Sequence, residues 1–109
     1  MGKKIFIAYG HHNVKDSFNA FVRDTFIDEA EKCGHEIDLI NLHEEKQLDY
    51  FNGTPPNDQI LDYRKRLEKC DVMFLISPCY NLRASAILEN WIDLVLAPKW
   101  FFSFHQVVG

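Results

Sequence analysis

The sequence lacks the features that mark several large classes of protein. It contains no apolar run long enough to span a bilayer and no pattern of a secretory signal peptide. Its net charge is only -4, and it has no basic patch of the kind that nucleic-acid-binding surfaces carry. Its three cysteines show no metal-ligand spacing, and the adjacent His11 and His12 have no carboxylate or cysteine at ligand spacing. These absences favour a cytoplasmic protein without a metal site that binds neither nucleic acid nor a membrane.

The composition predicts a single globular domain over residues 1–109. Hydrophobic residues make up 47% of the chain and charged residues 26%, which suits a packed core rather than a disordered chain. A chain of 109 residues can bury a modest core. No internal repeat or low-complexity linker divides it.

Three apolar segments are expected to form strands: Lys4–Tyr9, Glu36–Leu42 and Val72–Ile76. The first and third are nearly continuous apolar runs, which are typical of strands covered on both faces. The second is interrupted by Asp38 and Asn41, so we expect it at an edge of the sheet.

Three helices are expected to alternate with these strands. The first begins after Ser17, a good N-cap, and ends before Gly34, a natural helix stop. The second covers about residues 58–70 and the third about residues 85–96. The apolar face of the first helix is predicted to carry Phe18, Phe21, Val22, Phe26, Ala30 and Cys33. The solvent face of the second is predicted to carry Lys65, Arg66, Glu68 and Lys69.

The βαβαβα order predicts an α/β protein with a parallel sheet and helices on both faces. Placing the two most apolar strands side by side gives the strand order 2-1-3. The loops after the first and third strands, residues 10–17 and 77–84, then face each other across the crevice where such sheets bind ligands.

The first of these loops is suited to an anion. It leads into a helix N-terminus, where free N–H groups and the helix dipole favour a phosphate, and His11, Ser17 and Asn19 can add donors. The loop has one glycine, so it is neither a dinucleotide fingerprint nor a P-loop. The alternative is that Ser17 serves only as a cap and Asn19 only as a polar residue of the first turn.

The second loop is suited to a flat ligand. Such a ligand could lie against Tyr80 while the backbone N–H groups of residues 79–82 meet its polar edge. The alternative is a tight turn in which Asn81 adopts a turn conformation and Tyr80 packs on the aromatic C-terminal segment.

Four segments carry a family resemblance. Lys4–His11 is similar to a first strand followed by a histidine, and Ser17–Ala20 matches an S-F-N-A helix start. Pro78–Asn81 matches a P-x-Y-N loop, and Ala86–Asp93 is similar to an A-x-L-K-x-W-I-D helix. In this order and at these separations, the segments resemble the flavodoxin-like NAD(P)H:quinone oxidoreductases, with the P-x-Y-N loop closer to the related azoreductases and FMN reductases.

The resemblance implies a flavodoxin-like three-layer fold with bound FMN, or alternatively FAD, and with NAD(P)H as co-substrate. Hydride would pass through the flavin to a small quinone-like or azo acceptor, in a homodimer, and no side chain need act as a catalytic acid or base. The flavin's phosphate and ribityl side would be held by His11, Ser17, Phe18 and Asn19. Its ring system would be contacted by Pro78, Cys79, Tyr80, Asn81 and Leu82.

The sequence departs from this family in two ways. The quinone-reductase branch has tryptophan in place of Asn81 and proline in place of Ser85. Family members also continue with a fourth strand, a glycine-containing loop and a fifth strand, which are absent here. The far edge of the third strand is therefore expected to be open. This favours an alternative function: a truncated, non-catalytic flavodoxin-like module that dimerises or binds a partner.

Overall fold

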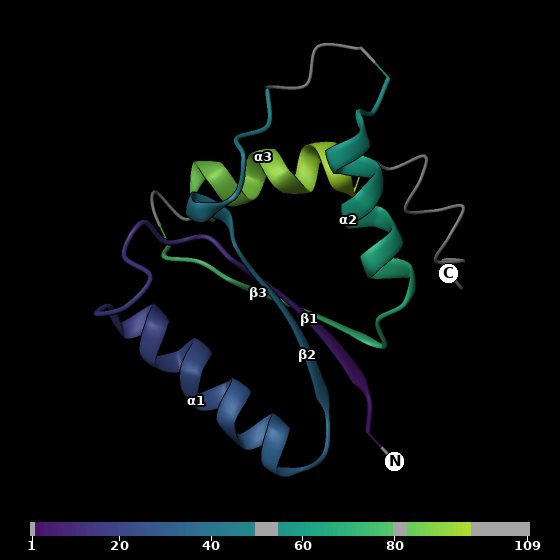
Figure 1. Ribbon diagram of the computed structural model, residues 1–109. Helices are drawn as coiled ribbons and strands as arrows, with labels where there is room; N and C mark the ends of the chain where they lie inside the picture. Colours follow the sequence, from purple (N-terminus) through teal and green to yellow (C-terminus); the bar gives the residue numbers. More distant parts are fainter. Residues whose placement is uncertain (1, 50–54, 80–82, 97–109) are drawn as a thin grey trace.

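The computed structural model describes residues 2–49, 55–79 and 83–96 (Figure 1). Three parallel strands form one open sheet in the order β2-β1-β3, which confirms the predicted order. The strands are β1 (Lys4–Tyr9), β2 (Glu36–Asn41) and β3 (Val72–Ile76). The second strand ends one residue earlier than expected, because Leu42–Glu44 form the short 3-10 helix η1.

Three α-helices cover the two faces of this sheet. They are α1 (Phe18–Lys32), α2 (Asp58–Glu68) and α3 (Ala86–Val95). Figure 1 shows α1 on one face and α2 with α3 on the other. In the part of the chain that the structure describes, no helix combines the length and apolar character needed to cross a membrane.

The helix ends follow the local chemistry of the sequence. The side chain of Ser17 accepts a hydrogen bond from the Ala20 amide at the start of α1. Asn57 caps α2 in the same way through the Ile60 amide. Gly34 follows α1 with φ of 85°, a left-handed conformation that favours glycine. The predicted start of α1 and the stop at Gly34 are therefore confirmed.

The core lies on both sides of β1, which is buried from Ile5 to Tyr9. On the α1 face, the buried cluster consists of Ile5, Ile7, Tyr9, Ala20, Ala30 and Ile76. On the opposite face, it consists of Phe6, Ala8, Ile40, Leu42, Ile60, Tyr63, Leu67, Leu88, Trp91 and Val95. The central strand thus fixes the positions from which the loops at its carboxyl end emerge.

The predicted apolar face of α1 is partly wrong. Phe18 and Phe21 are 77% and 66% exposed, whereas Ala20, Arg23 and Ala30 are buried. These three lie at helical spacing along the stripe that faces the sheet, so Phe18 and Phe21 fall on the opposite side of the helix.

The third strand is less covered than its apolar sequence predicts. Its residues are half-buried except for buried Ile76 and exposed Val72, of which 42% is accessible. The reason is its place at the end of the sheet, where β1 pairs with one of its edges. Its side chains still pack against both core clusters, Met73 and Leu75 on one face and Phe74 and Ile76 on the other, as expected of a strand covered on both faces. Among the described residues no strand pairs with its far edge, so the expected open edge is confirmed there.

One residue predicted to face solvent on α2 packs onto the sheet instead. The Arg66 guanidinium donates from Nε and Nη2 to the Asp38 carboxylate of β2, at 3.0 and 2.5 Å. The same guanidinium lies 5.6 Å from the Phe6 ring centroid. This bidentate pair ties α2 to the edge strand β2.

Candidate flavin site at the carboxyl ends of β1 and β3

The two predicted ligand loops meet beyond the carboxyl ends of β1 and β3. The Gly10 amide donates to the Ile76 carbonyl at 2.8 Å, which continues the ladder past both strands. The buried Ser85 hydroxyl donates to the Gly10 carbonyl at 2.6 Å, and the Ser85 amide donates to Ser77 Oγ at 2.7 Å. Ser85 therefore joins the two loops, a role that the sequence pattern did not indicate.

Only glycine fits at position 10, because there is no space for a side chain. A Cβ atom there would lie 2.9 Å from Ser85 Oγ and 3.0 Å from Leu88 Cβ. The loop can pass this closely over the start of α3 only because glycine has no side chain.

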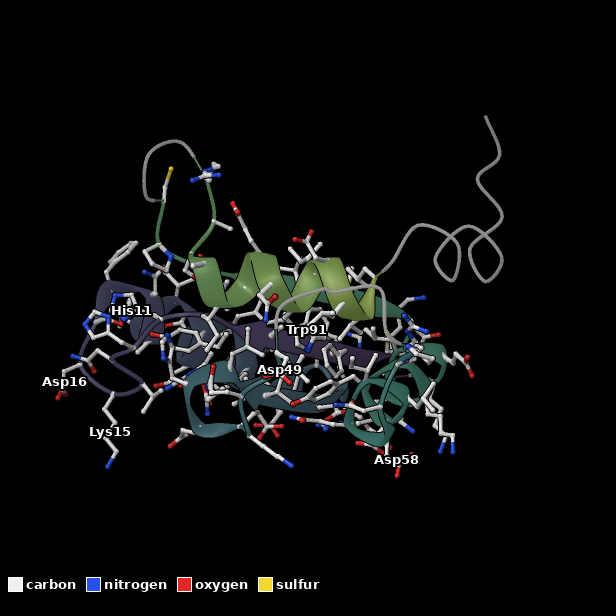
Figure 2. The ribbon with its side chains drawn as sticks, turned by 90° about the horizontal axis from the view of Figure 1, so that it is seen from above. His11, Lys15, Asp16, Asp49, Asp58 and Trp91 are labelled. Carbon is white, nitrogen blue, oxygen red and sulfur yellow. The ribbon has the colours of Figure 1, made fainter. Side chains whose placement is uncertain are left out.

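Side-chain hydrogen bonds hold the first loop in a compact turn. Asn13 Oδ1 accepts from the amides of Lys15 and Asp16 at 3.0 and 2.8 Å. The Tyr9 hydroxyl donates to the Asn13 carbonyl at 2.8 Å and lies 2.8 Å from Ser17 Oγ. The first loop is thus held by hydrogen bonds to the end of β1 and to the N-cap of α1. It lies at one end of the molecule: Figure 2 shows its residues His11, Lys15 and Asp16 far from Asp58, the first residue of α2.

The N-terminus of α1 presents donors for an anion. Within the described part of the chain, the amides of Phe18 and Asn19 have no hydrogen-bond acceptor, and the first turn carries no acidic side chain. His11 Nδ1 accepts from the Asn13 amide at 2.9 Å, so in the neutral ring Nε2 carries the proton and can donate. The predicted residues His11, Ser17, Phe18 and Asn19 therefore lie on one continuous loop and helix start.

The second loop is only partly described. Ser77 Oγ donates to the Pro78 carbonyl at 2.9 Å, and Cys79 is exposed. The predicted ring contacts Tyr80, Asn81 and Leu82 lie outside the described residues.

Three histidines lie near the ends of β1 and β2. The rings of His11 and His12 stack with centroids 4.4 Å apart. Partial burial lowers the pKa of His43, and the charges of His12 and His11 lower it further. Within the described ranges, no group of three or more histidine, cysteine, aspartate or glutamate side chains is arranged to hold a metal ion. The side chain of His43 is exposed, and its pKa depends on the charges of the first loop.

Arg23 is the most notable polar residue that the sequence pattern missed. It is 7% exposed and lies under the first loop. Its guanidinium donates to the Val14 carbonyl at 2.6 Å, to Asn41 Oδ1 at 2.9 Å and to Asp24 Oδ1 at 2.9 Å. Its Cζ atom lies 4.5 Å from the centroid of the Tyr9 ring. The signal available in the sequence was its position three residues after Ala20, on the buried stripe of α1.

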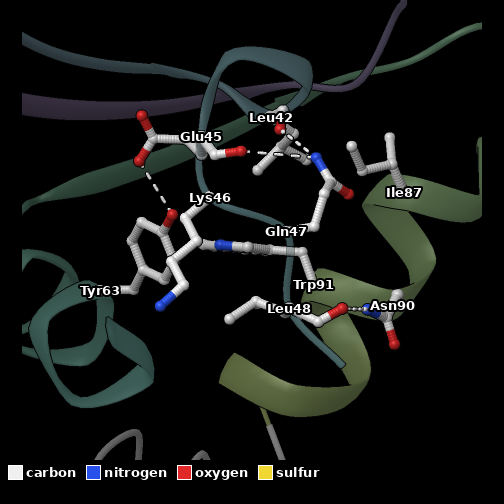
Figure 3. Close-up of a pocket in the computed structure, with 9 residues that line it drawn as sticks. All are labelled: Leu42, Glu45, Lys46, Gln47, Leu48, Tyr63, Ile87, Asn90 and Trp91. Atoms are coloured by element: carbon white, nitrogen blue, oxygen red, sulfur yellow. Dashed lines mark hydrogen bonds between the residues drawn. The ribbon is translucent and has the colours of Figure 1, made fainter. Parts of the chain in front are cut away.

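A separate small pocket lies between the segment after β2 and helices α2 and α3 (Figure 3). Its volume of about 20 Å³ admits roughly one water molecule, so it is too small for a flavin. Tyr63 donates to Glu45 Oε1 at 2.8 Å, and burial is the main cause that raises the pKa of Tyr63 to about 12. The buried Nε1 of Trp91 has no hydrogen-bond partner among the residues that the structure describes.

An open parallel sheet with two loops meeting at its carboxyl edge is typical of doubly wound α/β proteins, and the strand order 2-1-3 occurs in their flavodoxin-like members. The chain matches the family described as having a flavodoxin-like fold over residues 3–108, and it belongs to that family. This result confirms the resemblance that the four sequence motifs indicated.

The chain is also similar to individual proteins and solved structures. The chain is 25% identical to ribosyldihydronicotinamide dehydrogenase [quinone] of Mus musculus, over 93% of this chain and 54% of that protein. An NAD(P)H:quinone oxidoreductase structure from Methanothermobacter marburgensis superposes with a TM-score of 0.75 at 20% identity, over 87% of this chain and 53% of the other. FerB, a flavoenzyme NAD(P)H:(acceptor) oxidoreductase from Paracoccus denitrificans, gives a TM-score of 0.70 at 24% identity, over 88% and 52%. The chain spans about half the length of the curated relatives it matches.

Proposed function

We propose that this chain binds FMN, or alternatively FAD, and acts as an NAD(P)H oxidoreductase. The proposed acceptor is a quinone or an azo compound. The observation that carries the proposal is the contact of Gly10 with Ile76 and Ser85 at the carboxyl ends of adjacent strands. The first loop leads from there to two helix amides that have no acceptor among the described residues. The names of the mouse and Paracoccus relatives, a quinone dehydrogenase and a flavoenzyme, support it.

The donor set fits a phosphate monoester. Two backbone amides, those of Phe18 and Asn19, point out of the first turn of a 15-residue helix. The proposed role of His11 is to donate from Nε2 to the same phosphate. The exposed Phe18 ring stands beside this site and is available to cover the ribityl side of the flavin.

When bound, the flavin supplies the hydride acceptor and donor of the reaction. The proposed contribution of the protein is to fix its position. Pro78 and Cys79 begin the loop assigned to the ring system, and Tyr80, Asn81 and Leu82 complete that assignment from the family resemblance. No side chain is assigned as a catalytic acid or base.

Titration of the purified chain with FMN and with FAD, followed by flavin fluorescence, tests the proposal directly. Oxidation of NADH and NADPH is then measured with a quinone and with an azo dye as acceptors. Uptake of FMN together with acceptor-dependent oxidation supports the proposal. A chain that binds neither flavin contradicts it.

A backbone substitution tests the phosphate site more sharply. Phe18→Pro removes the first helix amide, and proline suits this position because Ser17 is extended, with φ of -99° and ψ of 163°. Phe18→Ala is the matched control, because it removes the ring and keeps the amide. Loss of one charge-assisted hydrogen bond is expected to weaken FMN binding about tenfold in Phe18→Pro relative to Phe18→Ala. Binding of riboflavin, which lacks the phosphate, should be equal in the two variants, and equal FMN binding would refute the assigned site.

The second candidate function is a non-catalytic module that dimerises or binds a partner. It is favoured by the open edge of β3, an apolar strand with exposed Val72 at the end of the sheet. Sedimentation analysis over a range of concentrations distinguishes the two functions. Self-association without flavin uptake favours the module, whereas a monomer that binds flavin and oxidises NAD(P)H contradicts it.

A further inference from the structure

Arg23 is a buried cation with little buried counter-charge. Its carboxylate partner, Asp24, has a side chain that is 62% exposed and therefore well solvated. The other two acceptors, the Val14 carbonyl and Asn41 Oδ1, are neutral. Burying a charge is costly, and well-packed apolar side chains often give equal or greater stability at such positions. Packing alone therefore does not account for an arginine here.

The contacts of Arg23 converge on the candidate anion site. The guanidinium joins the first loop at Val14, the end of β2 at Asn41 and the end of β1 at the Tyr9 ring. The Tyr9 hydroxyl, in turn, bonds the Asn13 carbonyl and contacts the Ser17 cap. Arg23 and Tyr9 thus hold the first loop at Val14 and Asn13 and reach Ser17, the residue that precedes the two helix amides.

We infer that Arg23 is a positioning residue for anion binding at the start of α1: it holds the loop of residues 10–17 from beneath and adds positive charge to the site. This inference rests on the proposed flavin site and names a residue that acts through the loop, without touching the ligand. A planar guanidinium suits the role, because it can reach three acceptors at once while its face lies on an aromatic ring. Its partly compensated charge favours a ligand that carries a phosphate over one that does not.

The test compares Arg23→Met with Arg23→Lys by titration with FMN and with riboflavin. Arg23→Met should weaken FMN binding about tenfold and riboflavin binding less than about threefold, because only FMN responds to the lost charge. Arg23→Lys keeps the charge and should recover most of the preference for FMN. Lys32→Met is the matched control, since it removes an exposed cation from the far end of the same helix. It should leave both affinities within about twofold.

Amide hydrogen exchange of the ligand-free chain provides a second readout. Exchange of the amides of residues 10–17 should be faster in both Arg23 variants. Methionine has no donor, and a compact ammonium group cannot span acceptors that the wider planar guanidinium reaches on three segments. A chain without flavin uptake overturns the proposed function, and the exchange rates then decide the inference separately. Exchange rates of residues 10–17 that are the same in the variants as in the wild type overturn the inference about Arg23.

Two further outcomes decide the charge argument. Equal weakening of FMN and riboflavin binding in Arg23→Met would indicate a merely structural role and overturn the inference. Should Arg23→Met fail to fold, Asp24→Asn replaces it, because this change leaves the guanidinium less neutralised. It should strengthen FMN binding about twofold without affecting riboflavin. An unchanged ratio of the FMN and riboflavin affinities in Asp24→Asn then overturns the inference.

Discussion

Replacement of Ser85 by alanine removes the hydroxyl that joins the two candidate flavin loops. The hydroxyl donates to the Gly10 carbonyl at 2.6 Å in a buried position. Leaving a buried acceptor without its donor costs about 1–3 kcal/mol. Ser85 is the N-cap of α3, but its side chain makes no capping hydrogen bond, so no loss of capping adds to this cost. The bond from the Ser85 amide to Ser77 Oγ remains. We therefore expect a loss of about 1.5 kcal/mol and a fall in Tm of about 7 °C.

Urea unfolding followed by circular dichroism measures this loss. Thr25→Ala, at an exposed position of α1, is the control and should change stability by less than about 0.5 kcal/mol. The Gly10→Ala variant adds a coupling test, because its Cβ would lie 2.9 Å from Ser85 Oγ. Part of that strain disappears when Ser85 is alanine, so the double variant should lose less than the sum of the single losses. A Ser85→Ala protein as stable as the wild type, or strictly additive losses, would refute the proposed junction.

Three further predictions concern the α2–α3 side of the sheet. Burial raises the pKa of Tyr63 from 10.0 to about 12, so the folded state keeps the phenol proton that the unfolded chain loses. Stability should therefore fall as the pH rises from about 10 to 12, and Tyr63→Phe should flatten this decline in urea unfolding at alkaline pH. Asp38→Asn breaks the partly exposed bidentate pair with Arg66 and should cost about 1 kcal/mol, less at high salt; a loss independent of salt would contradict the ionic explanation. Trp91→Phe removes a buried N–H without a partner among the described residues, so it should cost less than about 2 kcal/mol by chemical denaturation, against about 3–5 for Trp91→Ala.

The elements of this fold follow from local chemistry that a sequence displays openly. Ser17 and Gly34 bound α1 because one side chain can cap a helix and the other residue can adopt positive φ. The interrupted strand β2 lies at an edge because Asp38 needs a polar partner, which Arg66 supplies. The strand order then follows from right-handed crossovers and from the burial of β1.

Side-chain burial on α1 could not be predicted in the same way. Its apolar residues occur around much of the helix, so periodicity alone did not show which sector faces the sheet. The sheet accepts Ala20 and Ala30 with Arg23 between them, and it leaves Phe18 and Phe21 outside. That choice depends on the space above β1 and on the acceptors at the ends of β1 and β2.

The two loops of the candidate site could be predicted from the sequence, but the hydrogen bonds that hold them could not. Parallel topology brings residues 10–17 and 77–84 together whatever their side chains are. The bonds through Ser85 and Arg23 depend on partners distant in the sequence, and no local pattern marks them. The assignments of Tyr80, Asn81 and Leu82 remain predictions from the family resemblance.

The central place of β1 has a consequence for the order of folding. Of the three described strands it is synthesised first, yet it pairs with β2 from Lys4 to Glu36 and with β3 from Ile5 to Val72. Pairing with β2 closes the shorter loop and costs less chain entropy, so it is expected to precede pairing with β3. The apolar side chains of β1 that face α2 and α3 are covered only after Val95 has joined their cluster. On a ribosome, the most buried of the three described strands therefore gains its last core contacts only after the residues of α3 have been synthesised.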